Sequence, residues 1–441
     1  MPEGGGVMIR LFQLLKKQPP GRLITLGFAC VILLGTFLLL LPVSINPGVE
    51  VSFTDALFTS TSAVCVTGLI AIDTADHFTV FGRAVVALLI QIGGLGVTSV
   101  GVAFILAAGK RVGMKGRLLV REALNVNTSK GMIRLVKSVL LMTLCFELGG
   151  AILSFIVFAR DYPPPAALGI SIFHSIAAFN NSGFDILGGM QNLIPYQNDV
   201  LLNLTTSVLI IFGGLGFLVI LDILKNRSFK KLSLHSKVVI TTSTALLIMG
   251  TLLLKATEDI SWLGAFFQSV SARTAGFSTY PIGEFTNAGL FILVLLMFIG
   301  ASPGSTGGGI KTSTFFALVQ SVKSLMAKKH YSAFHRSIPA EGIAKAYHIT
   351  LLSLLVVCAG TLGLCILEPQ CTFIQILFEV TSAFGTVGLS TGITPELRDI
   401  SKLALVLIMF IGRLGAFTLA SMWVCRPAPN ARYIEESITI G

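Results

Sequence analysis

Four short polar stretches, each centred on a glycine, contain residues that could coordinate a cation through backbone oxygens. They read CVTG, NNSG, RTAG and GTVG and end at Gly68, Gly183, Gly276 and Gly388. Glycine adopts a positive φ readily, so successive carbonyl groups can point the same way. Carbonyl oxygens arranged around one axis can replace the hydration shell of a cation. The candidate coordinating residues are Val66, Thr67 and Gly68; Asn181, Ser182 and Gly183; Thr274, Ala275 and Gly276; and Thr386, Val387 and Gly388.

The four stretches belong to a longer internal repeat. A phenylalanine stands ten residues before each glycine, at Phe58, Phe173, Phe266 and Phe378. Further along, a glycine cluster interrupts the next apolar run, beginning at Gly93, Gly213, Gly300 and Gly412. Self-similarity of this kind indicates four copies of one unit: helix, short helix, glycine loop and kinked helix. Close helix packing at small residues is the alternative explanation for the glycine clusters.

The apolar runs around these loops indicate an integral membrane protein. Charged residues make up only 12% of the 441 residues, whereas a soluble domain has about 25%. We predict an all-α polytopic membrane protein with eight transmembrane helices and four re-entrant pore loops in a fourfold pseudo-symmetric arrangement. The short helices are too brief to cross about 30 Å of hydrocarbon. The predicted spans lie near 23–45, 80–108, 136–159, 200–224, 237–257, 286–325, 346–367 and 401–425.

The net charge of +11 could suggest nucleic acid, but its distribution indicates membrane topology instead. Basic groups at 10–22, 110–137, 225–237, 323–345 and 426–432 all fall on one side of an eight-span chain. The positive-inside rule makes this side the cytoplasm, with both termini there. Anionic lipid head groups are the expected neighbours, and no nucleic-acid partner is expected. Asp73, Asp76, Asp185 and Glu284 follow the loops on the outer side; they could concentrate cations or be ordinary solvated acids.

The repeats and the basic connections divide the chain into segments. We predict a cytoplasmic N-terminus (1–22), a first repeat (23–109), a basic cytoplasmic loop (110–135), a second repeat (136–225), a third repeat (226–325), a second basic loop (326–345), a fourth repeat (346–425) and a cytoplasmic tail (426–441). The third repeat contains a candidate intramembrane gating loop at 300–312.

The predicted sixth span, 286–325, cannot be one helix, because Pro303 and a run of glycines interrupt it. Irregular polar backbone at membrane depth is tolerated only when it is buried in protein or lines a wet cavity. We expect this segment to act as a hinge that blocks the pore beneath the third loop when the segment is in its lowered position. A structural kink without such a role is the alternative. The candidate gate residues are Gly300, Ser302, Gly304, Ser305, Thr306, Gly307, Gly308, Gly309, Lys311 and Arg413.

Three basic residues lie within the predicted membrane region, where charge is expensive and usually functional. Arg413 could form a barrier to cations or hold a loop carbonyl. Lys311 could do the same or extend toward the membrane surface. Arg273 would repel a cation if it faced the axis, so we expect it to point away and brace its loop, with Glu379 or Glu147 as a partner.

No catalytic constellation is visible, so no enzyme is expected. The seven cysteines are scattered without a CxxC pair, and the six histidines form no HExxH motif. Glu147, Asp222 and Glu379 fall in different repeats. No cofactor or resident metal is expected in the chain. A sodium-coupled secondary transporter of another small solute is the alternative, although such folds usually have two inverted halves.

The ordered set CVTGL, NNSGF, RTAGFST and GTVGLST, with GASPGSTGGGIKT at 300–312, resembles the Trk/Ktr/HKT superfamily of potassium transporters. With about 22 residues before its first span, the chain looks most like the KtrB type, the membrane subunit of bacterial Ktr systems. The resemblance implies potassium uptake across the bacterial inner membrane, with potassium as the substrate. It also implies a homodimer whose contact includes the tail from Tyr433, a cytosolic nucleotide-binding KtrA-type ring, and sodium dependence as in many relatives.

Overall fold

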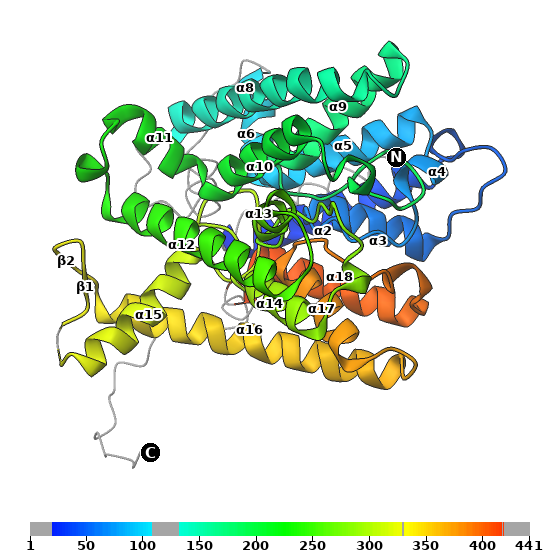
Figure 1. The fold of residues 1–441 in the computed structure, drawn as a ribbon. Coiled ribbons are helices and arrows are strands. Elements are labelled where there is room, and N and C mark those ends of the chain that lie inside the picture. The colour runs from blue at the N-terminus through cyan, green and yellow to red at the C-terminus, as the bar shows by residue number, and fades with distance from the viewer. Residues whose placement is uncertain (1–19, 108–131, 329, 417, 419–441) are drawn as a thin grey trace, which may run out of the picture.

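The computed structural model describes residues 20–107, 132–328, 330–416 and 418. Apart from one two-stranded hairpin, the elements of this part of the chain are helices (Figure 1). Most of the basic groups at 10–22 and 110–137, and the C-terminal tail, lie outside the described residues.

The elements recur in the same order four times. The first unit contains α2 (Pro20–Leu39), η1 (Pro42–Ser44), α3 (Phe53–Val64), α4 (Thr74–His77), α5 (Val80–Leu95) and α6 (Val97–Ala107). The second contains α8 (Met132–Phe158), α9 (Pro164–Phe179), η2 (Ile194–Tyr196), α10 (Val200–Leu215), α11 (Phe217–Asn226) and η3 (Phe229–Lys231).

The third unit contains α12 (Leu234–Thr257), α13 (Trp262–Ser271), η4 (Ile282–Glu284), α14 (Asn287–Phe298), α15 (Thr312–Met326) and the hairpin of β1 (Ser332–Ala333) and β2 (Arg336–Ser337). The strands pair antiparallel, with Ser332 opposite Ser337. The fourth unit contains α16 (Ala340–Leu367), α17 (Phe373–Gly385), η5 (Thr394–Glu396) and α18 (Asp399–Leu414).

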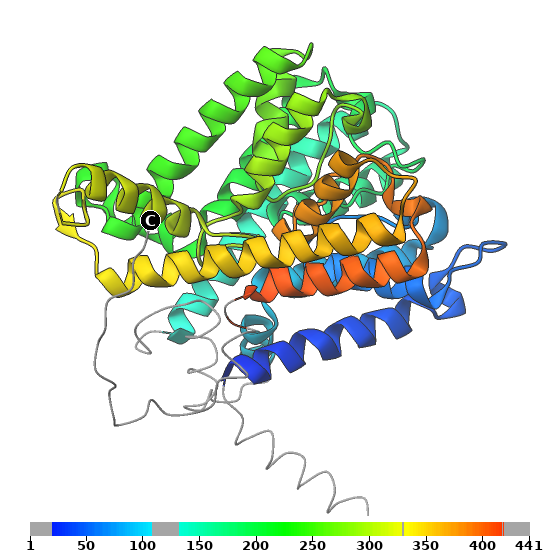
Figure 2. The same cartoon turned by 90° about the horizontal axis from the view of Figure 1, so that it is seen from below.

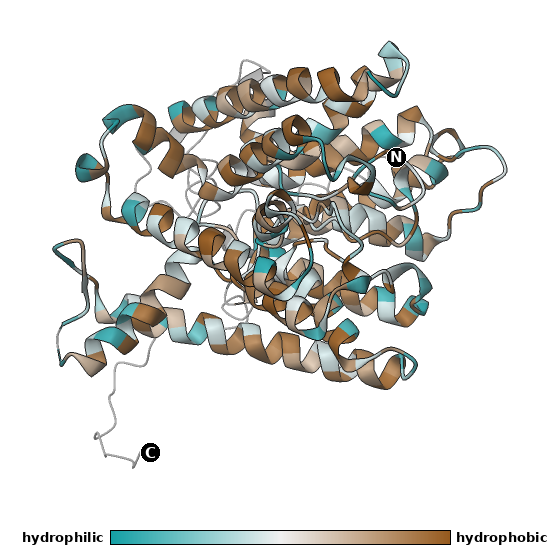
Figure 3. Ribbon diagram, in the orientation of Figure 1, coloured by the Kyte–Doolittle hydropathy of each residue, from teal (hydrophilic) through white to brown (hydrophobic). Residues whose placement is uncertain are grey.

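The first helix of each unit is long and apolar enough to cross a membrane. The four candidate spans are Gly21–Leu39, Ile133–Phe158, Leu234–Thr257 and Ala340–Leu367. Apolar residues run along these helices, whereas polar residues gather at the ends of the bundle (Figure 3). The chain is therefore built as a helical membrane protein.

The second helix of each unit is broken, and in three units a glycine ends the helix. Helices α5, α10 and α18 stop just before Gly96, Gly216 and Gly415, whose φ values are 82°, 93° and 86°. A right-handed helix cannot contain a positive φ, so each glycine ends its helix. Helices α10 and α11 meet at a bend of 97°. The predicted spans at 80–108, 200–224 and 401–425 are thus not continuous helices.

The short helices begin where capping residues satisfy their first N–H groups. Ser52 caps α3 by accepting from the Asp55 N–H, and Ser261 caps α13 by accepting from the Gly264 N–H. Thr372 and Gln375 form a capping box at the start of α17. Helix α9 instead begins at Pro164, whose fixed φ suits the first helical position.

The four units close into a circle. The second helix of each unit packs on the short helix of the next: α5 on α9, α10 on α13, α14 on α17, and α18 back on α3. Figure 2 shows α16 (yellow) and α18 (orange-red) running side by side. This arrangement brings the four glycine loops together at the centre of the bundle.

Candidate ion-conducting site

The four loop glycines lie edge to edge in a ring. Gly68, Gly183, Gly276 and Gly388 have φ values of 85°, 67°, 79° and 96°. A Cβ on each would come within 3.0 Å of one carbonyl oxygen in the next loop: Ser182, Ala275, Val387 and Thr67, in that order. The contacts run in one sense and return to the first loop. We refer to these four glycines and four carbonyls as the glycine ring.

The carbonyls of the ring accept no hydrogen bond from their own loops, because the nearby N–H groups donate to the preceding short helices instead. The N–H groups of Thr67, Ser182 and Val387 donate to the carbonyl five residues earlier, at 2.7, 2.9 and 2.9 Å. Within the described part of the chain, no group donates to the carbonyl oxygens of Thr67, Ser182, Ala275 or Val387. Such oxygens are suited to bind a desolvated cation.

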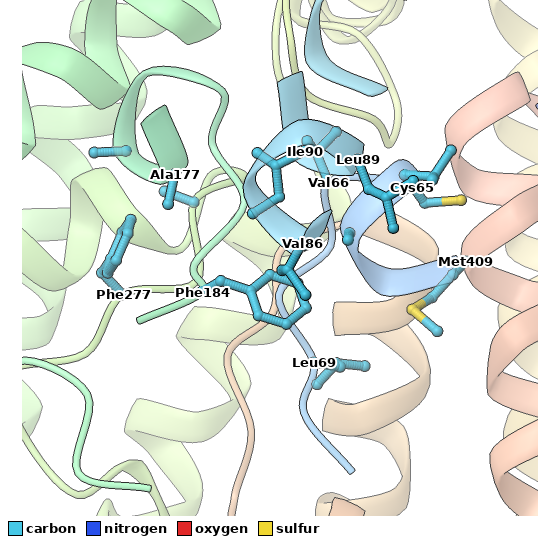
Figure 4. Close-up of a cluster of buried hydrophobic side chains, with 14 of the residues drawn as sticks. Cys65, Val66, Leu69, Val86, Leu89, Ile90, Ala177, Phe184, Phe277 and Met409 are labelled. Atoms are coloured by element: carbon cyan, nitrogen blue, oxygen red, sulfur yellow. The ribbon is translucent and has the colours of Figure 1, made fainter. Parts of the chain in front are cut away.

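Buried residues fix the outer rim of the ring. Leu69, Phe184 and Phe277, each directly after a loop glycine, are fully buried, as the close-up of this core shows (Figure 4). The Ser62 hydroxyl accepts from the Gly68 N–H and donates to the Leu69 carbonyl. Ser382 accepts from the Gly388 N–H at 3.0 Å. Apolar packing and serine side chains therefore hold the loops from behind.

The third loop is one residue shorter than the others. The Ala275 N–H donates to Ser271, only four residues earlier, and Phe267, not the predicted Phe266, is the fully buried phenylalanine of α13. The count of ten from glycine to phenylalanine selects the wrong residue in this repeat, because two adjacent phenylalanines mask the deletion. The other three loops carry a positive φ at Val66, Asn181 and Thr386, a costly conformation away from glycine.

Arg273 points out of the ring, as expected, but its predicted partners are wrong. Its guanidinium donates to the Ser243 hydroxyl of α12 at 3.2 Å, and its side chain is buried. Glu379 instead accepts from Ser390, Thr391 and Thr394, which follow the fourth loop. Glu147 accepts from the side chain of Asn180 at 3.1 Å.

The α14–α15 loop, residues 299–311, lies against the glycine ring. The Gly308 N–H donates to the Thr386 hydroxyl at 2.8 Å. A Cβ on Gly307 would collide with the Thr274 side chain. Two residues of the candidate gate thus touch two residues of the candidate filter, at the third and fourth loops.

The glycine clusters of the other units hold this loop. The N–H groups of Ser302 and Thr306 donate to the Gly214 and Gly213 carbonyls at 3.0 and 3.3 Å. Arg413 donates to the Thr306 carbonyl and to the Gly93 carbonyl, which joins three units at one side chain. The glycine clusters also allow close helix packing, the alternative explanation given for them. A Cβ on Gly93, Gly213 or Gly412 would strike a carbonyl near the end of a short helix, that of Val64, Phe179 or Phe384 respectively.

The remaining gate candidates brace the loop internally. Lys311 donates its ammonium to the Gly307 carbonyl at 2.7 Å, Ser305 to the Ser302 carbonyl, and the Ser302 and Thr312 hydroxyls lie 2.9 Å apart. Gly304 and Gly309 supply positive φ values of 70° and 68°. A Cβ on Gly300 would strike the Gly308 carbonyl, so the two ends of the loop meet.

Two of the outer acids support structure. Asp73 is buried, caps α4 and accepts from the Met190 N–H at 2.7 Å. Asp76 accepts from the Gly189 N–H at 3.1 Å. Both acids join the segment after the first loop to the segment after the second. Asp73 is therefore not an ordinary solvated acid, which was one of the two interpretations that the sequence allowed.

A family model described as TrkH, a cation transport protein, matches residues 30–252 and 236–431. The chain belongs to the TrkH family. This family transports cations, which confirms the expectation that the chain is not an enzyme. It also agrees with the membrane location that the apolar helices indicate.

Curated TrkH-family relatives match along nearly the whole chain. The "Ktr system potassium uptake protein B" of Bacillus subtilis is 40% identical, with 96% of this chain and 97% of the relative covered. The "Potassium/sodium uptake protein NtpJ" of Enterococcus hirae is 38% identical, covering 97% and 98%. Among solved structures, the potassium transporter TrkH of Vibrio parahaemolyticus matches with a TM-score of 0.72 and 20% identity, over 92% of this chain and 84% of that one. That likeness supports the TrkH fold.

Sequence reasoning missed several contacts of this TrkH-family site. The ion pair between Lys402 of α18 and Asp55 of α3, 3.0 Å long, joins the fourth unit to the first. The position after the buried phenylalanine of each short helix is polar and buried in all four units: Thr59, His174, Gln268 and Glu379. The spacing of the phenylalanines could have revealed this position in three units, but in the third the count of ten gives Phe266 and hides Gln268.

Proposed function

We propose that the chain is the membrane subunit of a bacterial potassium-uptake system and conducts potassium through the glycine ring. The support is the closed circle of four loops, in which each loop presents a free carbonyl beside the glycine of its neighbour. The residues Val66–Gly68, Asn181–Gly183, Thr274–Gly276 and Thr386–Gly388 form the filter. The named relatives take up potassium, which favours this cation over others.

We propose eight membrane crossings and four re-entrant loops, in the four repeats delimited above. The long first helices cross directly, and the broken second helices line the path. The basic connections and both termini face the cytoplasm of the bacterial cell. The α14–α15 loop is the gate, since its glycines abut the filter and Arg413 fastens it from across the path.

The assembly is part of the same proposal. A homodimer would bind a cytosolic, nucleotide-binding KtrA-type ring, which would control the gate; the "Ktr system" name of the B. subtilis relative favours a system of several subunits. Sodium dependence is also proposed, and the potassium/sodium name of the E. hirae relative favours it. A sodium-coupled secondary transporter of another small solute remains the second candidate function.

Potassium rescue tests the pore directly. The chain is expressed, with and without a KtrA-type partner, in cells that lack their own potassium uptake, and growth and rubidium uptake are followed at low potassium. Rescue is expected, and Gly388→Ser should abolish it, because a Cβ there meets the Thr67 carbonyl. Gly392→Ser is the matched control: Gly392 also has a positive φ, 94°, but no atom within 4 Å of its Cβ position.

A well-inserted protein that restores no uptake with any partner or with sodium present would overturn the proposal. Equal rescue by Gly388→Ser and Gly392→Ser would remove the filter assignment while leaving transport in place.

A further inference from the structure

The 97° bend between α10 and α11 turns the chain sideways at one end of the bundle. If α10 runs through the membrane, α11 must run roughly parallel to the membrane plane. Figure 1 places α11 at the same end as the start of α12 and the β1–β2 hairpin. This is the end to which the basic connections belong.

The segment of α11 and η3, residues 217–231, has the composition of an interfacial helix. Leu224 and Phe229 are exposed, by 62% and 46%. Four basic side chains, Lys225, Arg227, Lys230 and Lys231, are exposed beside them. Interfacial helices combine apolar and basic side chains in this way, because the first enter the acyl boundary and the second meet anionic head groups.

The positive charge of this segment is not neutralised within the described part of the chain. None of the four basic residues forms an ion pair there. Asp222, the one acid between 217 and 237, is already engaged by the Ser233 N–H at 3.0 Å and the Ser236 hydroxyl at 2.5 Å. Unpaired surface cations of this density attract an anionic membrane.

The same segment is joined to the α14–α15 loop through its first residue. The Phe217 N–H donates to the Gly304 carbonyl at 3.0 Å. Gly213 and Gly214, at the end of α10 just before Phe217, accept hydrogen bonds from the same loop. A Cβ on Gly216 would meet the Pro303 carbonyl at 2.7 Å. Any tilt of α11 must therefore disturb these backbone contacts.

We propose that α11 and η3 bind anionic phospholipid head groups, and that this contact holds the α14–α15 loop in its position below the glycine ring. The occupant is the membrane that surrounds the protein, because the exposed leucine and phenylalanine need an apolar phase next to the charges. Lipid binding by α11 and η3 does not depend on the proposed function. The effect of lipid on opening does depend on it, because that effect requires the α14–α15 loop to be the gate. Anionic lipid then favours the closed path.

The binding is tested without any flux measurement. The purified full chain is placed in nanodiscs of phosphatidylcholine, with or without phosphatidylglycerol, and amide hydrogen exchange is measured at 217–233 and 300–312. Phosphatidylglycerol should slow exchange in both segments. The triple change Lys225→Gln, Lys230→Gln and Lys231→Gln should remove the effect, since each lysine near an anionic surface strengthens binding about fivefold. The control changes Lys137, Lys323 and Lys328 to Gln, three exposed lysines outside the segment.

Each result decides one part of the proposal. Equal exchange at 217–233 with and without phosphatidylglycerol, or equal loss in the test and control variants, would overturn lipid binding. A response at 217–233 without one at 300–312 would overturn the coupling. In liposomes, phosphatidylglycerol should lower rubidium flux in the wild type more than in the triple variant. Absence of flux in every lipid would instead contradict the proposed function, while the exchange data would stand by themselves.

Discussion

The backbone N–H of Gly308 donates a hydrogen bond to the side-chain hydroxyl of Thr386, over 2.8 Å. Gly308 belongs to the α14–α15 loop, and Thr386 belongs to the fourth glycine loop, in a left-handed conformation with a φ of 49°. The candidate gate and the candidate filter thus share a direct contact. If the α14–α15 loop moves, either this hydrogen bond breaks or the fourth glycine loop moves with it.

Thr386→Val should loosen the gate. Valine keeps the shape but leaves the buried Gly308 N–H without an acceptor, which costs about 1–3 kcal/mol. Rubidium uptake without the partner subunit should therefore rise. Thr143→Val, in α8 and outside the filter and the gate, is the matched control, since the buried Thr143 hydroxyl has no partner among the described residues. Equal uptake in the two variants would show that the hydrogen bond does not restrain the gate.

Arg413 should restrain the loop through shape as well as charge. Its guanidinium reaches two carbonyls, those of Thr306 and Gly93. Lysine keeps the charge but has a compact head that cannot replace the planar fork. Arg413→Gln and Arg413→Lys should both raise rubidium uptake if the bridge matters most. If only Arg413→Gln does so, the arginine acts as an electrostatic barrier and not as a clamp.

Glu379 should set the outer shape of the fourth loop. One carboxylate oxygen accepts from the Ser390 hydroxyl and the Thr391 N–H, and the other from the Thr394 hydroxyl. Glu379→Gln replaces one acceptor with a donor, so we expect a loss of about 1–3 kcal/mol in stability and a weaker apparent affinity for potassium. Uptake kinetics against potassium concentration measure the second effect. Glu396→Gln, at an exposed acid nearby, should change neither.

The Lys402–Asp55 pair should close the circle of units. Both side chains are mostly buried, with 10% and 16% exposed. Removing one partner of a buried pair costs about 3–5 kcal/mol because the other charge is stranded. Lys402→Met and Asp55→Asn should each lower the unfolding temperature in detergent, and the double variant should recover part of the loss. Additive losses in the double-mutant cycle would contradict a direct coupling.

The start of α18 should lose stability in acid. Burial raises the pKa of the Glu368 carboxyl, but donation by the Ser401 hydroxyl, the Arg398 N–H and the Gln370 side chain outweighs it and leaves the pKa below its ordinary value. A lowered pKa gives stability that is present above about pH 4.3, the unfolded value. That stability is lost as the pH falls through the folded pKa.

Thermal unfolding across pH measures this effect. Wild type should unfold at a higher temperature than Glu368→Gln at pH 7, and the two curves should approach each other as the pH falls from about 4.3 through the folded pKa. A difference that is the same at pH 7 and pH 4 would exclude the carboxylate as its source.

The sequence predicted the local features well and the contacts between repeats poorly. The positive φ of the four loop glycines and the break after Phe298 follow from residue types that leave few backbone conformations. The outward direction of Arg273 follows from charge alone. Its partner, Ser243, does not, because Ser243 lies in an ordinary helix and nothing in its neighbourhood distinguishes it. Arg413 reaches Gly93 across 320 residues, a contact that only the closed circle of units creates.

Register was the other source of error. The third loop lacks one residue, but Phe266 and Phe267 are adjacent, so a count along the sequence still found a phenylalanine at the expected place. Burial distinguishes the two, and burial depends on the helix face that packs inward.

Fusing four units into one chain frees each quarter to specialise. In an assembly of identical subunits, any substitution would appear four times around the axis, and a shortened loop or a buried arginine would have to be tolerated at every corner. Here the third quarter alone has the short loop and supplies the α14–α15 loop, the fourth supplies the arginine that fastens it and the glutamate behind the rim, and the second supplies the carbonyls on which it rests. The ring keeps its symmetry in the glycines, while the contacts around the α14–α15 loop are asymmetric, so one side of the path can change without redesigning the other three.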